Sequence, residues 1–230
     1  MRILERQPRE SGRDYALRTI KDNIIHLDLA PGSLISENEL AVQLGLSRTP
    51  VREALIELSR SKVVEIAPQK RTVVAPIDSA MVEEARFTRH VLECAVAELV
   101  CTMATQEDLF RLEENVKLQE FYIENGPVEV LMELDDAFHH MLFDIARKPQ
   151  IHGLVQLIAI HFDRVRSLAL TNIQDLKIVK DHRQILEAIR TRDGEKAKEM
   201  MSKHLSRSKV DAAALREKFP QYFRKETADK

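Results

Sequence analysis

Hydrophobic residues recur with two different patterns along this chain, and the pattern changes near residue 76. Before that position, short stretches with apolar residues three and four apart predict helices, and β-branched runs at 63–66 and 72–74 predict a hairpin. From Ala80 to Tyr222 only the helical spacing continues, in long segments. These segments are interrupted at Asn125-Gly126-Pro127, Lys148-Pro149, Thr171-Asn172 and Asp193-Gly194. The later pattern predicts about six helices in an all-α antiparallel helical bundle.

Three short helices are expected before the hairpin. The first is predicted over 15–27, with one apolar stripe made of Leu17, Ile20, Ile24 and Leu27. The second starts with the capping-box pattern of Ser36 and Glu39 and ends at Gly45. The third opens at 47–50 (Ser-Arg-Thr-Pro), where a serine cap and a first-turn proline are both favourable. Three helices followed by a hairpin predict a winged helix-turn-helix.

We therefore expect a mainly α protein with two domains. Residues 1–76 are predicted to form the winged helix-turn-helix, with residues 1–13 as a flexible arm. Residues 77–230 are predicted to form the helical bundle.

The third helix has one apolar face and one cationic face. Its predicted buried stripe consists of Val51, Ala54, Leu55 and Leu58. This stripe places Arg48 and Arg52 on the opposite, solvent-exposed face. A helix-turn-helix presents the start of its second helix to the major groove, where arginine can bond guanine O6 and N7. The hydroxyls of Ser47 and Thr49 suit phosphate oxygens, and Lys70 and Arg71 occupy the tip of the wing. The alternative is a helical hairpin with a solvated polar face.

A long string of residues in this region resembles the DNA-binding domain of the GntR superfamily. It comprises Pro31-Gly32, Glu39-Leu40-Ala41, the run from Gly45 to Leu55 (GLSRTPVREAL) and Ala67-Pro68-Gln69-Lys70. The resemblance implies that Arg48 and Arg52 are the main DNA contacts, supported by Ser47, Thr49 and the wing tip. The chain departs from the family at Lys62 and Arg71, where glycine is usual. Arg71 adds a cation at the wing and removes the glycine of the tight turn.

Net charge adds little to this interpretation. The chain of 230 residues has a formal charge of −2. Residues 1–76 carry 12 basic and 10 acidic side chains, and the rest carry 23 and 27. A small excess of this kind is compatible with a DNA-facing first half but does not require one.

Cysteine content and hydropathy indicate the compartment. Cys94 and Cys101 lie seven apart in one apolar helical stretch and are interpreted as reduced core thiols. The sequence has neither an apolar run long enough to span a membrane nor a signal-peptide pattern at its charged start. We expect a cytoplasmic protein without a membrane partner.

Histidines in the second half raise the question of a metal. Asp135 and His139 are four apart, which on a helix places a carboxylate and an imidazole on one face, a common arrangement for metal ligands. An ordinary hydrogen bond between them is the alternative. His182 and His204 lie on later predicted helices beside apolar stripes, where each has a structural interpretation too.

The region from about Asp78 to Tyr222 resembles the FCD domain, the ligand-binding partner of one GntR branch. Its metal-binding members carry an aspartate, a phenylalanine and a histidine on one helix and a histidine on each of two later helices. The positions that match are Asp135, Phe138, His139, His182 and His204. The resemblance implies a divalent metal held by Asp135, His139, His182 and His204. Zinc is the expected ion, and nickel or manganese are the alternatives. It further implies a small carboxylate or sugar-acid effector at the metal.

Arginines are the candidates for binding that effector's carboxylate. Arg89 matches an arginine of the family's pocket, but a salt bridge to Glu93, four residues on, explains it equally well. Arg164 is a second candidate, together with Arg166. His140 and His161 fall outside the family's ligand pattern and are interpreted as structural or secondary.

The expected function is a ligand-responsive bacterial transcriptional regulator, a homodimer that binds a palindromic operator. A closer alternative is a metal-independent regulator that responds to acyl-coenzyme A, which the four intact ligand positions disfavour. A third is a regulator for which the metal itself is the signal. A metal-dependent hydrolase is a rival from another class, but the chain lacks an evident general base such as the glutamate of H-E-x-x-H.

Overall fold

A computed structural model describes residues 1–67, 71–172 and 177–225. The chain divides into two compact units, each assembled from more than one segment. Unit 1 contains Met1–Val82, Ile160–Leu168 and Leu215–Lys230, and unit 2 contains Glu83–Ala159 and Ala169–Ala214.

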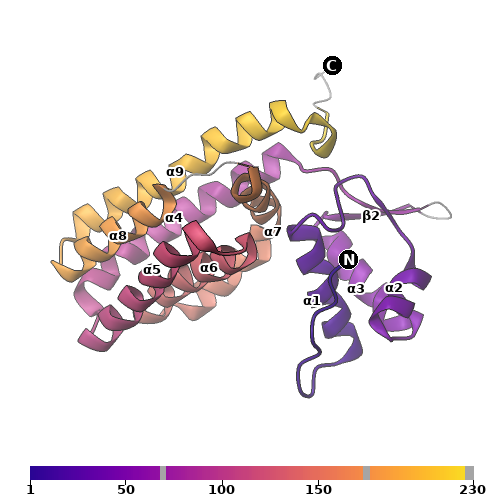
Figure 1. Cartoon of the computed structure of the whole chain (residues 1–230), viewed down its shortest axis with the longest axis horizontal. Coiled ribbons are helices and arrows are strands. Elements are labelled where there is room, and N and C mark those ends of the chain that lie inside the picture. The colour runs from indigo at the N-terminus through magenta and orange to yellow at the C-terminus, as the bar shows by residue number, and fades with distance from the viewer. Residues whose placement is uncertain (68–70, 173–176, 226–230) are drawn as a thin grey trace. The chain divides into compact units, whose positions relative to one another are not determined.

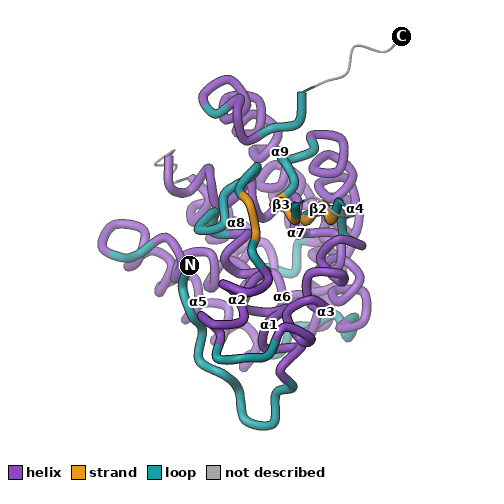
Figure 2. The backbone as a smooth tube through the Cα atoms, turned by 90° about the vertical axis from the view of Figure 1, so that its right-hand side faces the viewer, coloured by secondary structure: helices purple, strands orange, loops and turns teal. Residues whose placement is uncertain are grey.

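Unit 1 contains a helical triad and a small sheet. The helices are α1 (Gly12–Ile25), α2 (Glu37–Leu44) and α3 (Arg48–Arg60), and the strands are β1 (Leu34–Ile35), β2 (Val64–Ile66) and β3 (Thr72–Val74). The strand order is β1-β3-β2, and both pairings are antiparallel; Figure 2 shows β2 and β3 side by side. The predicted hairpin is confirmed. The third strand, β1, was not predicted, because two residues carry no periodicity of their own.

Two of the predicted local signals of the helix-turn-helix are present, the Ser36 cap and the Gly45 turn, but the predicted Ser47 cap is not, because its side chain makes no capping bond with any described residue. The Ser36 side chain caps α2 by accepting a 3.3 Å bond from the Glu39 amide, and Gly45 ends the helix with a left-handed φ of 64°. The buried residues of α3 are Val51, Ala54, Leu55 and Leu58, the stripe that the sequence predicted. Lys62, where the GntR family usually has glycine, adopts a φ of 57° just after α3.

The first helix differs in part from its prediction. It ends at Ile25, so Leu27 lies beyond it with a φ of 65°, and Leu17 is only partly buried. The buried positions are Tyr15, Ala16, Thr19, Ile20, Asn23 and Ile24. The prediction missed the polar members of this face because it counted apolar residues only.

Buried Asn23 accounts for another difference, which concerns the expected flexible arm. Its amide donates to the Arg2 carbonyl at 2.8 Å, and its Oδ1 accepts from the Arg2 amide at 2.6 Å. The Tyr15 hydroxyl donates to the Leu4 carbonyl at 3.0 Å. These bonds hold the first residues along α1, because a buried side-chain amide needs partners for both of its polar atoms.

Unit 2 is built from most of six long helices. The α-helices described from residue 79 onward are α4 (Ser79–Met103), α5 (Gln106–Asn125), α6 (Val128–Ile145), α7 (Pro149–Asn172), α8 (Lys177–Arg190) and α9 (Gly194–Lys218), followed by the short 3-10 helix η1 (Pro220–Tyr222). Residues 79–82 of α4, 160–168 of α7 and 215–218 of α9 belong to unit 1. The all-α bundle is confirmed. The predicted breaks at Asn125-Gly126-Pro127, Lys148-Pro149 and Asp193-Gly194 overlap gaps between helices, but Thr171 and Asn172 are the last residues of α7. α5 packs against both α6 and α8, and Figure 1 shows this group of helices together with α4 and α9.

The core of unit 2 consists of apolar side chains from several of these helices. It includes Leu112, Phe138, Leu142, Ile185 and Leu186, none more than 1% exposed. Cys94 and Cys101 are buried free thiols in the same core. Within the described residues, no helix is both long and apolar enough to cross a membrane.

Candidate metal centre and nucleic-acid interface

Three helices of unit 2 bring one carboxylate and three imidazoles together. α6 supplies Asp135 and His139, α8 supplies His182 and α9 supplies His204. One ligand atom from each lies within 4.8 Å of the others. The Nε2 atom of His204 lies 3.2 Å from that of His139 and 3.3 Å from that of His182. All four residues are at least nine-tenths buried.

The His182 ring is oriented by its neighbours on both sides. Gln119 of α5 donates its amide to Asn115 Oδ1 at 2.7 Å and to the Leu134 carbonyl at 3.3 Å, so its Oε1 remains for His182 Nδ1 at 2.7 Å. Since an amide oxygen only accepts, Nδ1 carries the proton and Nε2 presents a lone pair. Phe138 stacks on the ring at 4.3 Å between centroids.

The His139 ring is held by a buried ion pair. Its Nδ1 faces the Glu93 carboxylate of α4, and the other oxygen of Glu93 accepts from Arg89 Nε at 2.6 Å. Burial opposes ionisation of Glu93, but the neighbouring Arg89 guanidinium, and next the contact with the His139 ring, hold the pKa of this carboxyl well below its usual range. A carboxylate behind a histidine is the usual outer partner of a metal-ligating imidazole.

Burial also sets the protonation state of the other two rings. Desolvation, reinforced by the His139 ring, lowers the pKa of His204 to about 3. The pKa of His182 lies well below its ordinary value, mainly because of desolvation and secondly because of the neighbouring His204 ring. Both rings are therefore neutral at physiological pH, and neutral imidazole is the form that binds metals.

The arrangement fits a metal ion on grounds of distance and chemistry. Two nitrogens bound to one tetrahedral zinc at about 2.1 Å are separated by roughly 3.4 Å, close to the observed Nε2 separations of 3.2 and 3.3 Å. With the His204 proton on Nδ1, the three Nε2 lone pairs face one another, and a cation between them removes their repulsion. Asp135 faces the same point, with Oδ1 3.5 Å from His182 Nε2.

Sequence reasoning missed the outer partners Gln119 and Asn115. A signal was present: Leu112, Val116 and Ile123 form an apolar stripe on α5, and Gln119 occupies the stripe position between them. A buried amide in such a stripe needs a specific partner.

The predicted effector residues Arg89 and Arg164 belong to different units of the chain. Arg89 is beside the cluster, but it is paired with Glu93, as the alternative interpretation expected. Arg164 belongs to unit 1, where it is fully buried and donates to the Ala75 carbonyl at 2.6 Å. Burial lowers its pKa to about 10. His161, on the same turn of α7, contacts the Ser61 carbonyl at 2.7 Å.

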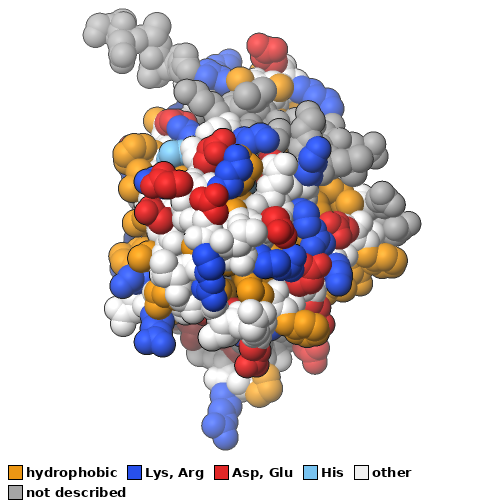
Figure 3. Space-filling view, turned by 90° about the vertical axis from the view of Figure 1, so that its left-hand side faces the viewer, with side chains coloured by type: hydrophobic (Ala, Val, Ile, Leu, Met, Phe, Trp, Pro, Cys, Tyr) orange, Lys and Arg blue, Asp and Glu red, His pale blue; other side chains and the backbone are white. Residues whose placement is uncertain are grey.

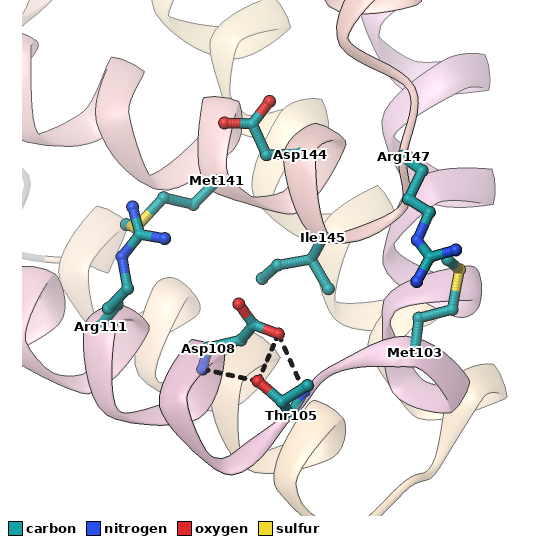
Figure 4. Close-up of a pocket in the computed structure, with 8 residues that line it drawn as sticks. All are labelled: Met103, Thr105, Asp108, Arg111, Met141, Asp144, Ile145 and Arg147. Atoms are coloured by element: carbon teal, nitrogen blue, oxygen red, sulfur yellow. Dashed lines mark hydrogen bonds between the residues drawn. The ribbon is translucent and has the colours of Figure 1, made fainter.

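A surface pocket of unit 2 lies apart from these residues. Its volume is about 430 Å³, and it is lined by residues at the end of α4, the start of α5 and the end of α6 with the turn that follows. Figure 4 shows Arg111 and Arg147 on opposite sides, with Asp108, Asp144 and apolar side chains between them. Two arginines and two aspartates balance in charge, and Asp108 is already engaged by the Thr105 cap.

The start of α3 in unit 1 carries the predicted DNA contacts. Ser47, Arg48, Thr49 and Arg52 are all exposed. Ser47 is the N-cap residue, but its side chain makes no capping bond in the described structure, which leaves the hydroxyl available for a ligand. Arg48 Nη2 lies 3.4 Å from Glu37 Oε2 at the start of α2.

A groove of about 550 Å³ joins this helix start to the wing. It is lined by Arg48, by Arg71 and Thr72 at the root of β3, and by residues 34–39. Lys70 lies outside the described residues. The groove lining contains two basic side chains, Arg48 and Arg71, and two acidic ones, Glu37 and Glu39. The face drawn in Figure 3 also mixes acidic and basic side chains.

Comparison with known proteins decides the family. Residues 15–74 match the model of bacterial regulatory proteins of the gntR family, and residues 84–207 match the FCD domain. The chain belongs to the GntR family. Members of this family are transcriptional regulators rather than enzymes, which removes the hydrolase interpretation.

Curated relatives extend over nearly the whole chain. The HTH-type transcriptional repressor RspR of Escherichia coli K12 is 30% identical over 220 residues, covering 95% of this chain and 96% of that protein. An uncharacterized HTH-type regulator from an unstable DNA locus of Streptomyces ambofaciens is 31% identical, covering 96% and 92%. This chain is accordingly a DNA-binding transcriptional regulator of the FCD branch.

Solved structures share the fold. Escherichia coli McbR/YncC has a TM-score of 0.78 at 20% identity, covering 90% of this chain and 99% of that one. A GntR regulator from Rhodococcus sp. RHA1 has a TM-score of 0.74 at 20% identity, covering 89% and 99%.

Proposed function

We propose that this GntR-family regulator responds to a small carboxylate or sugar acid bound at a metal ion in its FCD domain. The observation that carries the proposal is the convergence of Asp135, His139, His182 and His204 in buried surroundings, with Nε2 atoms 3.2 and 3.3 Å apart. Zinc suits this donor set best, and nickel or manganese are the alternatives. When bound, the metal supplies a Lewis-acidic centre at which a carboxylate oxygen can coordinate.

The protein's own residues shape that site. Gln119 and Glu93 hold two of the rings with their lone pairs turned inward. Arg89 sits behind Glu93, and we assign it a positioning role in the site in addition to the effector contact expected from its family position. Arg164 is the weaker candidate for the effector, since its described bond is to the Ala75 carbonyl.

We assign operator binding to residues 1–76 and effector binding and dimerisation to residues 77–230. Arg48 and Arg52 would read bases in the major groove. Contacts with phosphates, or with the DNA minor groove beside the wing, would come from Ser47, Thr49, Lys70 and Arg71. A homodimer matches its two-fold axis to a palindromic operator. To act as a signal, the effector must bind one arrangement of the dimer's two DNA-binding domains more tightly than another arrangement.

The test combines DNA binding with thermal stability. A labelled palindromic duplex is selected from a random library with the purified protein, and its affinity is measured by anisotropy. A panel of small carboxylates and sugar acids is then screened by thermal shift with zinc-loaded and chelated protein. A carboxylate that raises the melting temperature only with zinc and changes operator affinity supports the proposal. The proposal is refuted if chelation leaves the melting temperature unchanged and acyl-coenzyme A raises it.

A further inference from the structure

We infer that Glu37 determines operator specificity by holding Arg48 in position to read a base. The inference rests on the proposed DNA-reading role of Arg48. It concerns a residue of α2, the helix before the recognition helix, for which the sequence suggested only a place in a capped first turn.

The two residues face each other across the turn of the helix-turn-helix. Glu37 is the first residue of α2, and Arg48 is the first residue of α3. The Arg48 Nη2 atom lies 3.4 Å from Glu37 Oε2. The Arg48 side chain is 67% exposed and the Glu37 side chain 24% exposed, so the arginine is the more solvent-accessible partner.

Guanidinium geometry permits both contacts at once. An arginine has five N–H donors in a fixed planar fork. The ion pair with Glu37 engages one terminal nitrogen, which leaves donors for the bidentate contact with guanine O6 and N7. A long side chain loses rotamer freedom when it docks, and an arginine already held by a neighbour loses less.

The Glu37 carboxylate also disfavours binding to DNA that lacks the matching base. Glu37 lines the groove that also contains Arg48 and Arg71. On a non-operator duplex, Arg48 finds no matching guanine, and the Glu37 charge repels nearby phosphates without any compensating contact. Glu37 therefore strengthens binding to the operator and weakens binding to other sequences.

Glu39 provides a matched control. It lies on the same helix, lines the same groove and carries the same charge. Among the described residues, it forms no ion pair with Arg48. Glu39→Gln therefore reports the effect of removing one negative charge from this surface, separately from the effect on Arg48.

The experiment measures anisotropy of E37Q, E39Q, R48A and the E37Q/R48A double variant on three duplexes. These are the selected operator, the operator with its Arg48-dependent guanine replaced, and an unrelated sequence. E37Q should lose about two- to five-fold in operator affinity, the range of an exposed ion pair, and should bind the unrelated duplex equally or more tightly. E39Q should strengthen binding to all three by the same factor.

One further variant, E37D, and the double variant separate the charge of Glu37 from its contact with Arg48. E37D retains the charge but withdraws the carboxylate by one methylene, so it should lose operator affinity without gaining affinity for unrelated DNA. In the R48A background, E37Q should no longer change the ratio of operator to unrelated binding. If E37Q behaves as E39Q does, the inference is wrong. If R48A leaves the same ratio unchanged, the assignment of α3 as the base-reading helix is wrong instead.

Discussion

Gln119 accepts a hydrogen bond from His182, with its Oε1 2.7 Å from the ring Nδ1. Gln119 is itself fixed by donating to Asn115 and to the Leu134 carbonyl. Because a metal ligand must present its lone pair in one direction, the amide on α5 controls how well the ring on α8 can bind an ion.

Replacing Gln119 should therefore weaken metal binding without removing a ligand. We expect Gln119→Ala to lower zinc affinity by about 10- to 100-fold, the usual effect of losing an outer-shell partner. Competition with a chromogenic chelator measures the affinity. Gln156→Ala is the matched control, because Gln156 contacts His152 outside the cluster. Equal zinc affinity for both variants would show that Gln119 does not orient the ligand.

Metal removal should lower thermal stability. Free zinc at 100 times its dissociation constant stabilises the native state by about 2.7 kcal/mol. For a chain of 230 residues this corresponds to roughly 5–10 °C in melting temperature. We expect chelation to cause this fall, zinc to reverse it, and His182→Ala and Asp135→Asn to abolish the response. His140→Ala should retain it, because His140 stacks on His152 outside the cluster.

Local patterns predicted helix α3 well. The stripe of Val51, Ala54, Leu55 and Leu58 follows from helical periodicity alone, and Gly45 marks the turn because glycine adopts positive φ readily. β1 was missed because its two residues become a strand only by pairing with Val73 and Thr72, far along the chain.

The candidate metal centre shows which features local sequence patterns cannot predict. Asp135 and His139 are visible as a four-residue spacing, but His204 lies 65 residues from His139, and spacing cannot predict that the two meet. The family resemblance supplied that set. It did not supply Gln119, and it gave no means of foreseeing that Arg164 is bonded to the Ala75 carbonyl in unit 1.

Arg71 should contribute to DNA affinity without contributing to sequence choice. It lines the groove beside Arg48 where the family usually has glycine, and a phosphate contact is independent of sequence. Arg71→Gly should weaken binding to all duplexes alike and reduce the salt dependence by about one unit of slope. Arg52→Ala should instead cost about 1–3 kcal/mol on the operator and relax specificity. Salt titrations on operator and unrelated DNA distinguish the two patterns.

Arg89 allows its two roles to be separated. Its Nε lies 2.6 Å from Glu93 Oε1 in buried surroundings, so Arg89→Met should destabilise the fold by about 3–5 kcal/mol by leaving a buried charge unpaired. The double variant with Glu93→Gln should recover most of that loss in urea unfolding. If Arg89 also holds the effector, the zinc-loaded double variant will be stabilised less by the carboxylate found in the thermal-shift screen than the Glu93→Gln single variant, which shares the altered contact with His139.

Glu113 links α5 to α8 and should make unit 2 sensitive to acid. Its carboxylate accepts hydrogen bonds from Arg183 and Arg190, each at 2.6 Å. These bonds lower the pKa of Glu113 to about 2, and the bond from Arg183 has the larger effect. A carboxyl whose folded pKa lies below its unfolded value of 4.5 stabilises the fold above that pH. This contribution to the free energy of unfolding is lost as the pH falls toward 2.

Glu113→Gln should lower the free energy of unfolding by roughly 1 kcal/mol at pH 7, and the difference from the unaltered protein should shrink by pH 3.5. Urea unfolding of chelated protein at both pH values measures it, with the more exposed Glu187→Gln as the control. A difference that stays constant with pH would mean that the two arginines do not stabilise the ionised form.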